Sequence, residues 1–322
     1  GCRFREALSD RAQAGVLIYV LYDEIGSKKL SRSFIQSLRQ NGIRIQPFHT
    51  TKGRGNRFQL NFRNHRKILV IDGQVAFVGG LNIGDEYLGK DPKLSPWRDT
   101  HLQLQGPAVQ TLQATFLRDW YWATNELLEA NWQVQPSTSV NATALILPTG
   151  PADSLPTCNL FFVQLIHQAS SRLWIASPYF VPDESTLSAL KLAALRGVDV
   201  RILLPNHPDH QSVYWCAFAF YPDLQSVGIR LYRYRDGFMH QKILLIDDAI
   251  ASVGTVNLDN RSFFLNFEVN AFITDKKFIQ EVEQMLKNDL NASISVDLSE
   301  YHRKSFWFRL GVKSARLMAP VL

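Results

Sequence analysis

The stretch NHRKILVID, residues 64–72, decides the fold of this chain, because most of it returns as HQKILLID at residues 240–247. Each copy holds a His, a Lys two residues later and an Asp five residues after that Lys. After six further residues come GGLN at 79–82 and GTVN at 254–257, so each copy also ends in an Asn. All four residue types keep the same offset of 175 residues, which indicates an internal duplication.

The length and composition describe a globular protein with more than one core. At 322 residues the chain exceeds what one hydrophobic core usually organises, so two lobes are expected. Apolar residues make up 46% and charged residues 20%, which excludes a disordered chain. The net charge of +6 weakly favours an anionic partner, either nucleic acid or an anionic membrane surface. The 3 cysteines have neither disulfide nor zinc spacing.

Strand-like and helix-like segments alternate in both halves, which predicts an α/β fold of two similar lobes. Each lobe is expected to be a mixed β-sheet flanked by helices, with the active site between the lobes. The expected strands cover 16–21, 43–48, 67–71, 75–78, 100–104, 173–176 and 198–204, and the expected helices 31–40, 109–128, 185–196 and 275–290. A polar loop over 50–61 leads to His65, and residues 213–221 are interpreted as a core helix or the lining of an acyl-chain entrance.

The domain limits follow from a polar stretch in the middle of the chain. Residues 135–143 are predicted to link a first lobe, 1–134, to a second lobe, 144–322. The second lobe opens with a strand and a complete helix, whereas the first lobe opens inside the equivalent helix. We therefore expect the first lobe to lack at least one strand that precedes residue 1.

The duplicated motif suits phosphate chemistry. Residues two apart on a strand face the same side, so His65 and Lys67 should project together, as should His240 and Lys242. Two facing lobes would then gather two imidazoles, two ammonium groups and the amides of Asn82 and Asn257 around one point. Such a cluster fits a phosphate, with one neutral His as nucleophile and the other as acid.

The motif resembles the phospholipase D superfamily, with its duplicated His-x-Lys-x4-Asp, and within it the bacterial cardiolipin synthases. The further segments that carry the resemblance are NFRNHRK at 61–67, GGLNIGDEY at 79–87, WRDTHL at 97–102, SPYFVPD at 177–183 and NLDNRSF at 257–263. The resemblance implies that one His becomes phosphatidylated, and we favour His65 as nucleophile and His240 as acid and base. Lys67, Lys242, Asn82 and Asn257 would hold the phosphoryl oxygens, with no metal and no cofactor.

The resemblance also places a carboxylate behind each catalytic His. Glu268 and Asp99 occupy equivalent strands, and we expect His65 to use Asp99 of its own lobe and His240 to use Glu268. Asp72 and Asp247 belong to the catalytic motif. Because they lie an odd number of residues after the lysines, however, they should face away and hold the turn.

The chain departs from the superfamily pattern two residues before each motif Asn. Gly80 and Thr255 stand where its members often have Ser, and Thr255 retains a hydroxyl group while Gly80 does not.

The implied activity is a cardiolipin synthase that joins two phosphatidylglycerol molecules and releases glycerol. Alternatives are a phospholipase D hydrolase or transphosphatidylase and, with less support, a nuclease of the superfamily. The expected partners are the anionic phospholipid and a membrane surface, without nucleic acid. The expected location is the bacterial cytoplasmic membrane, reached through N-terminal segments absent from this chain. Residues 301–322 mix basic and aromatic side chains, suited either to an anionic bilayer surface or to docking on the core.

Overall fold

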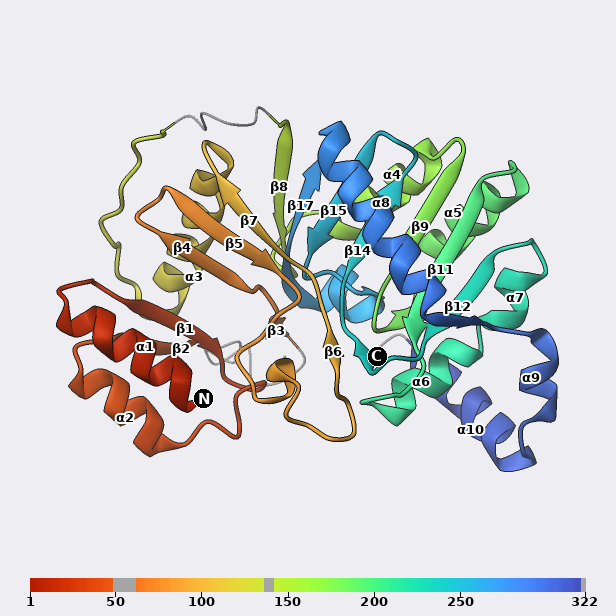
Figure 1. Cartoon of the computed structure of the whole chain (residues 1–322), viewed down its shortest axis with the longest axis horizontal. Helices are drawn as coiled ribbons and strands as arrows, with labels where there is room; N and C mark the ends of the chain where they lie inside the picture. The colour runs from red at the N-terminus through yellow and green to blue at the C-terminus, as the bar shows by residue number, and fades with distance from the viewer. Residues whose placement is uncertain (49–61, 136–141, 320–322) are drawn as a thin grey trace.

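The computed structural model describes residues 1–48, 62–135 and 142–319, and it confirms the predicted α/β fold of two similar halves. Figure 1 shows the two halves side by side, the first in red to yellow and the second in green to blue. The predicted loop over 50–61 and most of the predicted linker over 135–143 lie outside the described residues. The limits of the two lobes therefore stay a prediction.

The second half is built on one mixed sheet. Its order is β18-β12-β11-β9-β14-β15-β17, and both β8 and β3 pair with β17. Strands β9, β11 and β12 run parallel, whereas β14 and β15 are antiparallel to their neighbours and β17 is antiparallel to β15 and β8. The strands are β8 (Ala144–Thr149), β9 (Arg172–Ala176), β11 (Asp199–Pro205), β12 (Arg230–Tyr234), β14 (Ile243–Ile246), β15 (Ile250–Gly254), β17 (Asn266–Ile273) and β18 (Ser293–Ser295).

Helices cover both faces of this sheet, which explains its uninterrupted apolar strands. Helices α4 (Thr157–Gln168), α5 (Glu184–Leu195) and α6 (Gln211–Phe218) pack on one face, where Leu244 and Ile246 of β14 point. Helix α8 (Lys276–Asn291) packs on the other face, against Ile243 and Leu245. All four residues of β14 are therefore buried, and the strand that follows His240 and Lys242 is rigidly held.

The first half contains the same elements in a more divided arrangement. Strands β1 (Tyr19–Asp23) and β2 (Arg44–Phe48) form a parallel pair, while β4 (Ile68–Ile71), β5 (Val75–Gly79) and β7 (His101–Gln105) form an antiparallel sheet. In the second half β9 joins the corresponding strands. Within the described residues no strand of the first half joins β1 to β4 side by side into one sheet, as β9 joins β11 to β14 in the second half. The expected strand before residue 1 stays a prediction.

The helices of the first half agree with the sequence pattern. They are α1 (Cys2–Gln13), α2 (Arg32–Gln40) and α3 (Ala108–Thr124). Ser31 caps α2 by accepting a hydrogen bond from the Phe34 N–H. Helix α3 ends at Thr124, four residues before the predicted end at 128, because Asn125 adopts the left-handed conformation.

Two short parallel strand pairings join the halves. Strand β3 (Arg63–Asn64) of the first half runs parallel to β17, and β13 (Phe238–Met239) of the second half runs parallel to β6 (Trp97–Arg98). Strands β3 and β13 directly precede the two motif histidines, and β6 directly precedes Asp99. Figure 1 shows β3 and β6 between the two halves.

The C-terminal segment forms two helices, α9 (Leu298–Arg303) and α10 (Phe306–Leu317). Helix α10 packs against α6, and the predicted segment 213–221 divides into the end of α6 and the start of α7 (Tyr221–Gln225). Cys216, Ala217 and Phe218 are buried, which confirms the interpretation as a core helix, while the acyl-chain entrance stays a prediction. Among the described residues no helix is both long and apolar enough to cross a membrane.

Candidate active site

Backbone pairing between the halves sets the positions of both histidines. The His65 N–H donates to the carbonyl of Phe267, the residue before Glu268, at 2.9 Å. In the same way the His240 N–H donates to the carbonyl of Arg98, the residue before Asp99, at 2.7 Å. The backbone of each His is therefore hydrogen-bonded to the residue that precedes the carboxylate of the opposite half.

The carboxylates are consequently exchanged between the halves. Nδ1 of His65 lies 2.9 Å from Oε2 of Glu268, and Nδ1 of His240 lies 2.8 Å from Oδ2 of Asp99. The expectation that His65 pairs with Asp99 of its own lobe, and His240 with Glu268, is wrong. The physical reason is that β3 and β13 pair with the opposite half, which the strand match within one lobe could not show.

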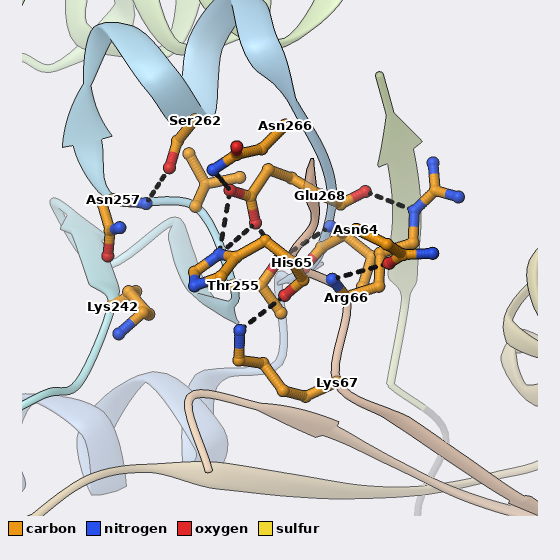
Figure 2. A network of polar contacts seen from close by, with 12 residues as sticks. Asn64, His65, Arg66, Lys67, Lys242, Thr255, Asn257, Ser262, Asn266 and Glu268 are labelled. Carbon is orange, nitrogen blue, oxygen red and sulfur yellow. Dashed lines mark hydrogen bonds and ion pairs between the residues drawn. The ribbon is translucent and has the colours of Figure 1, made fainter. Parts of the chain in front are cut away.

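Glu268 lies in a network of buried hydrogen-bond donors. Its side chain is 0% exposed and accepts hydrogen bonds from the Thr255 hydroxyl at 2.5 Å and from the Asn266 amide at 3.0 Å, besides the contact with His65 (Figure 2). Burial by itself raises the pKa of this carboxyl, but the charge and hydrogen bond of His65 and the nearby Lys67 lower it overall. Glu268 is therefore ionised at neutral pH and holds the His65 ring in one orientation.

Asp99 and His240 lie among aromatic rings instead. The His240 ring is 5.1 Å from the ring of Trp97, 5.8 Å from that of Tyr87 and 6.0 Å from that of Phe238, centroid to centroid. Asp99 accepts a hydrogen bond from the Thr100 N–H at 2.8 Å. Although burial raises the pKa of Asp99, the His240 hydrogen bond and the Lys242 charge lower it overall, so this carboxylate is ionised as well.

Both imidazoles are neutral at pH 7. Burial is the main cause of both shifts: it lowers the pKa of His65, and it lowers that of His240 to about 3. The charges of the nearby lysines act in the same direction. Since Nδ1 of each ring faces a carboxylate, the single proton of the neutral ring resides on Nδ1. Nε2 of each ring then carries a free lone pair, which is the form required of a nucleophile.

The two lysines lie close enough for the Lys242 charge to act on Lys67. Nζ of Lys67 donates to the His65 carbonyl at 2.7 Å, and Nζ of Lys242 donates to the His240 carbonyl at 2.5 Å. Burial lowers the pKa of Lys67 to about 7 and that of Lys242 to about 8. The Lys242 charge also lowers the pKa of Lys67, and the charges of both lysines lower the pKa values of the two histidines. An anion placed between them would relieve this repulsion, so the site is electrostatically prepared for phosphate.

The two motif asparagines differ. Asn257 is only 4% exposed, and its Oδ1 has no hydrogen-bond partner among the described residues. Asn82 is exposed, and its amide donates to the Tyr87 hydroxyl. Figure 2 shows Asn257 and Lys242 together on the side toward which the His65 ring points. The unpaired Oδ1 of Asn257 is an acceptor suited to a ligand hydroxyl, and its Nδ2 is the donor that a phosphoryl oxygen needs.

Asp72 and Asp247 lie in turns, at φ of 53° and 50° respectively. The Asp247 carboxylate accepts hydrogen bonds from the backbone N–H groups of Ser170, Ser171 and Arg172. Against the effect of burial, these bonds hold the pKa of Asp247 well below its usual range. Within the described part of the chain its hydrogen bonds reach neither a motif His nor a motif Lys, so it joins the turn to the start of β9.

A second layer of polar residues was missed in the sequence. The Arg66 guanidinium donates to Asp119 of α3 at 2.6 Å and to the Glu268 carbonyl at 3.0 Å. At the equivalent place in the second half, Gln241 donates to Asp289 of α8 at 2.7 Å. A signal was present, because both halves carry an Asp late in the helix that follows the carboxylate-bearing strand.

The surroundings of the two carboxylates explain why Gly80 and Thr255 differ. A Cβ added at Gly80 would lie 2.0 Å from Oδ1 of Asp99, so no side chain fits there. The longer Glu268 leaves room for the Thr255 hydroxyl. Among the described residues no group of three or more His, Cys, Asp or Glu side chains could hold a metal ion.

Comparison with known proteins follows the same division into halves. A family model described as "Cardiolipin synthase, PLD-like domain" matches residues 2–120 and 162–290. The chain is 48% identical over 326 residues to Cardiolipin synthase A of Pseudomonas putida (strain GB-1) and 49% identical over 324 residues to that of Pseudomonas fluorescens. Each alignment covers 100% of this chain and 67% of the relative.

Solved structures of other proteins resemble the whole fold. The phosphatidylserine synthase of Haemophilus influenzae superposes with a TM-score of 0.65 over 99% of this chain and 93% of its own. The sequence identity is 15%, so this likeness concerns the fold alone.

Proposed function

The chain belongs to the cardiolipin synthase family of phospholipase D-like domains, and from that premise we propose that it transfers a phosphatidyl group between two phosphatidylglycerol molecules. The products are cardiolipin and glycerol. The observation that carries the proposal is the pair of neutral imidazoles, each held at Nδ1 by a carboxylate of the opposite half, beside two lysines of lowered pKa.

In the first step Nε2 of His65 attacks the phosphorus of the first phosphatidylglycerol. A P–N bond forms, the P–O bond to the headgroup glycerol breaks, and His240 donates a proton to the departing oxygen. The result is a phosphatidyl-His65 intermediate and free glycerol. Asn257, Asn82 and the two lysines bind the non-bridging oxygens and compensate their charge.

In the second step a headgroup hydroxyl of another phosphatidylglycerol transfers its proton to His240 and attacks the phosphorus. The P–N bond breaks, His65 becomes neutral again, and cardiolipin leaves. No metal or cofactor takes part in this scheme, because the lysines supply the positive charge.

The exposure of the two rings supports this division of roles. His65 has the more accessible ring, with 24% of its side chain exposed against 7% for His240, as a nucleophile requires. His240 must gain a proton before it can act as acid. Burial is the largest cause of its pKa of about 3, and the charges of Lys242 and Lys67 add to it. The negative charge of a bound phosphodiester compensates the lysines and so acts to raise this pKa.

The site requires substrate from a lipid phase, so we propose that the protein works at the surface of the bacterial cytoplasmic membrane. Phosphatidylglycerol supplies both the donor and the acceptor there. Nucleic acid is not expected as substrate.

Product analysis tests the proposal. Purified protein is incubated with phosphatidylglycerol vesicles that carry a labelled headgroup glycerol and a labelled acyl chain, and both products are quantified. Cardiolipin and glycerol in equal amounts support the synthase. Phosphatidic acid as the sole lipid product would replace it with a phospholipase D hydrolase, and cleavage of an oligonucleotide without lipid turnover would indicate a nuclease.

A further inference from the structure

Helix α10 is apolar on two opposite faces. Its inner face holds Val312 and Ala315, which are buried, and Phe308, whose ring packs at 5.2 Å on the ring of Phe218 in α6. Its outer face carries Phe306 and Trp307, which are 64% and 76% exposed. A surface helix ordinarily places polar residues on the face opposite the core, so this second apolar face requires an explanation.

The outer face continues along the whole helix. Leu310 and Leu317 are 43% and 85% exposed and lie, by helical spacing, on the same side as Phe306 and Trp307. The helix itself is well anchored, because the Ser305 hydroxyl accepts a hydrogen bond from the Phe308 N–H at 3.2 Å and the Asn260 amide donates to the Ala319 carbonyl at 2.8 Å. Docking on the core therefore uses one face and leaves the other available.

Basic residues accompany this face, and acidic ones do not. Residues 301–322 contain Arg303, Lys304, Arg309, Lys313 and Arg316, and the sequence of this segment holds neither Asp nor Glu. The nearest carboxylates belong to other elements and are paired: Asp297 with Arg303, Glu300 with Lys304 and Arg233, and Asp223 with Arg316 and Lys191. In the described part of the chain no carboxylate pairs with Arg309 or Lys313.

We infer that the outer face of α10 docks on an anionic lipid bilayer. Exposed Phe, Trp and Leu side chains flanked by unpaired Arg and Lys are suited to this surface, since the rings enter the headgroup region and the cations meet anionic lipids. A protein partner would need its own acidic groove, and a second copy of this helix would bring like charges together. The bilayer satisfies both the apolar and the cationic parts of the face.

This docking rests on the proposed function, because it would place the site against the phase that contains its substrate. Helix α6 lies between α10 and the site: the loop before α6 carries Asp209, whose charge acts on Lys242. Figure 1 shows α6 and α10 together at the lower edge of the second half.

Vesicle sedimentation tests the inference without depending on turnover. The 322-residue chain is mixed with vesicles of equal parts phosphatidylglycerol and phosphatidylcholine, or of phosphatidylcholine alone. We expect binding to the anionic vesicles, and the triple variant Phe306→Gln, Trp307→Gln, Leu310→Gln should bind at least about tenfold more weakly, because it loses most of the inserted apolar area. The matched control is Leu192→Gln, Leu195→Gln, which alters exposed leucines of α5 and should bind as the parent does.

A charge variant separates the two parts of the surface. Arg309→Glu, Lys313→Glu should lose the preference for anionic vesicles, whereas Lys276→Glu, Lys277→Glu on α8 should keep it. Activity on a detergent-dispersed substrate should survive in the triple variant, so failure of docking can be told from failure of the proposed reaction. Vesicle binding equal to the parent, self-association lost in the triple variant, or tighter binding to DNA than to the anionic vesicles would each overturn the inference.

Discussion

The two half-sites contain the same His, Lys and Asn in different surroundings. His65 is partly exposed, and its partner Glu268 has two further donors in Thr255 and Asn266. His240 is almost fully enclosed by aromatic rings, and its partner Asp99 has the Thr100 N–H as a further donor. The duplication therefore supplies equivalent groups, while their environments distinguish an accessible imidazole from an enclosed one.

This difference teaches that motif symmetry and chemical symmetry are separate. A displacement at phosphorus requires one group that becomes covalently attached and another that exchanges only protons. An accessible ring with a well-fixed carboxylate is suited to the first task. An enclosed ring, shielded from bulk water, is suited to the second, because it exchanges its proton with the alcohol rather than with solvent.

Replacing each His by Ala should have the largest effect. Both His65→Ala and His240→Ala should lower steady-state turnover by about four orders of magnitude or more, since each removes a reacting group. With a radiolabelled phosphatidyl ester of nitrophenol, whose departure needs no acid, His240→Ala should accumulate labelled protein and His65→Ala should not, as judged by gel electrophoresis under alkaline conditions. Label retained by His65→Ala alone would reverse the two roles.

Replacing the carboxylates should have the next largest effect. Glu268→Gln and Asp99→Asn should each lower turnover by about 10²- to 10⁴-fold, because the imidazole loses both its orientation and the stabilisation of its cationic form. A phosphatidyl ester with a nitrophenol leaving group needs no acid in the first step. It should restore nitrophenol release in Asp99→Asn but not in Glu268→Gln, and equal restoration in both would contradict the crossed assignment.

The sequence allowed much of this site to be predicted, because the informative signals were local and repeated. The His-Lys spacing, the apolar strands behind it and the common offset each depend on neighbouring residues. The exchange of carboxylates could not be predicted, since it depends on β3 and β13, which are two residues long and carry no periodic pattern. The same holds for the contact of Arg66 with the Glu268 carbonyl, whose partners are 202 residues apart.

Exchanging Gly80 and Thr255 tests why the two carboxylates differ. Gly80→Thr should displace Asp99, whose Oδ1 lies where the new Cβ would be, and should lower turnover nearly as far as Asp99→Asn does. Combined with Asp99→Asn it should add little, because both act on one group. Thr255→Gly removes one hydrogen bond to Glu268 and should cost about tenfold, with Thr255→Ser as the control that keeps the hydroxyl. Additive losses in the Gly80 pair would exclude this explanation.

The lysines should determine the alkaline limb of the pH profile. The pKa of Lys67 is lowered to about 7 and that of Lys242 to about 8, so each loses its charge as the pH rises through that value, and kcat/KM for an anionic substrate should decline. An arginine stays charged throughout this range. Lys67→Arg and Lys242→Arg should therefore each move one component of the decline to higher pH, whatever their absolute rates. An unchanged profile in both variants would place the limb on another group.

The smallest effect on catalysis is expected from substituting Asp72 and Asp247. These two residues occupy equivalent turns in the two halves, away from the reacting atoms. Asp247 fixes the backbone N–H groups that open β9, so Asp247→Asn should lower the free energy of unfolding by about 1–3 kcal/mol through the loss of charge-assisted hydrogen bonds. The exposed Asp72 carboxylate has no hydrogen-bond partner within the described residues, so Asp72→Asn should change stability by less than about 0.5 kcal/mol. Denaturant unfolding measures both. A large loss of turnover in a stably folded Asp247→Asn variant would show that this residue does more than hold the turn.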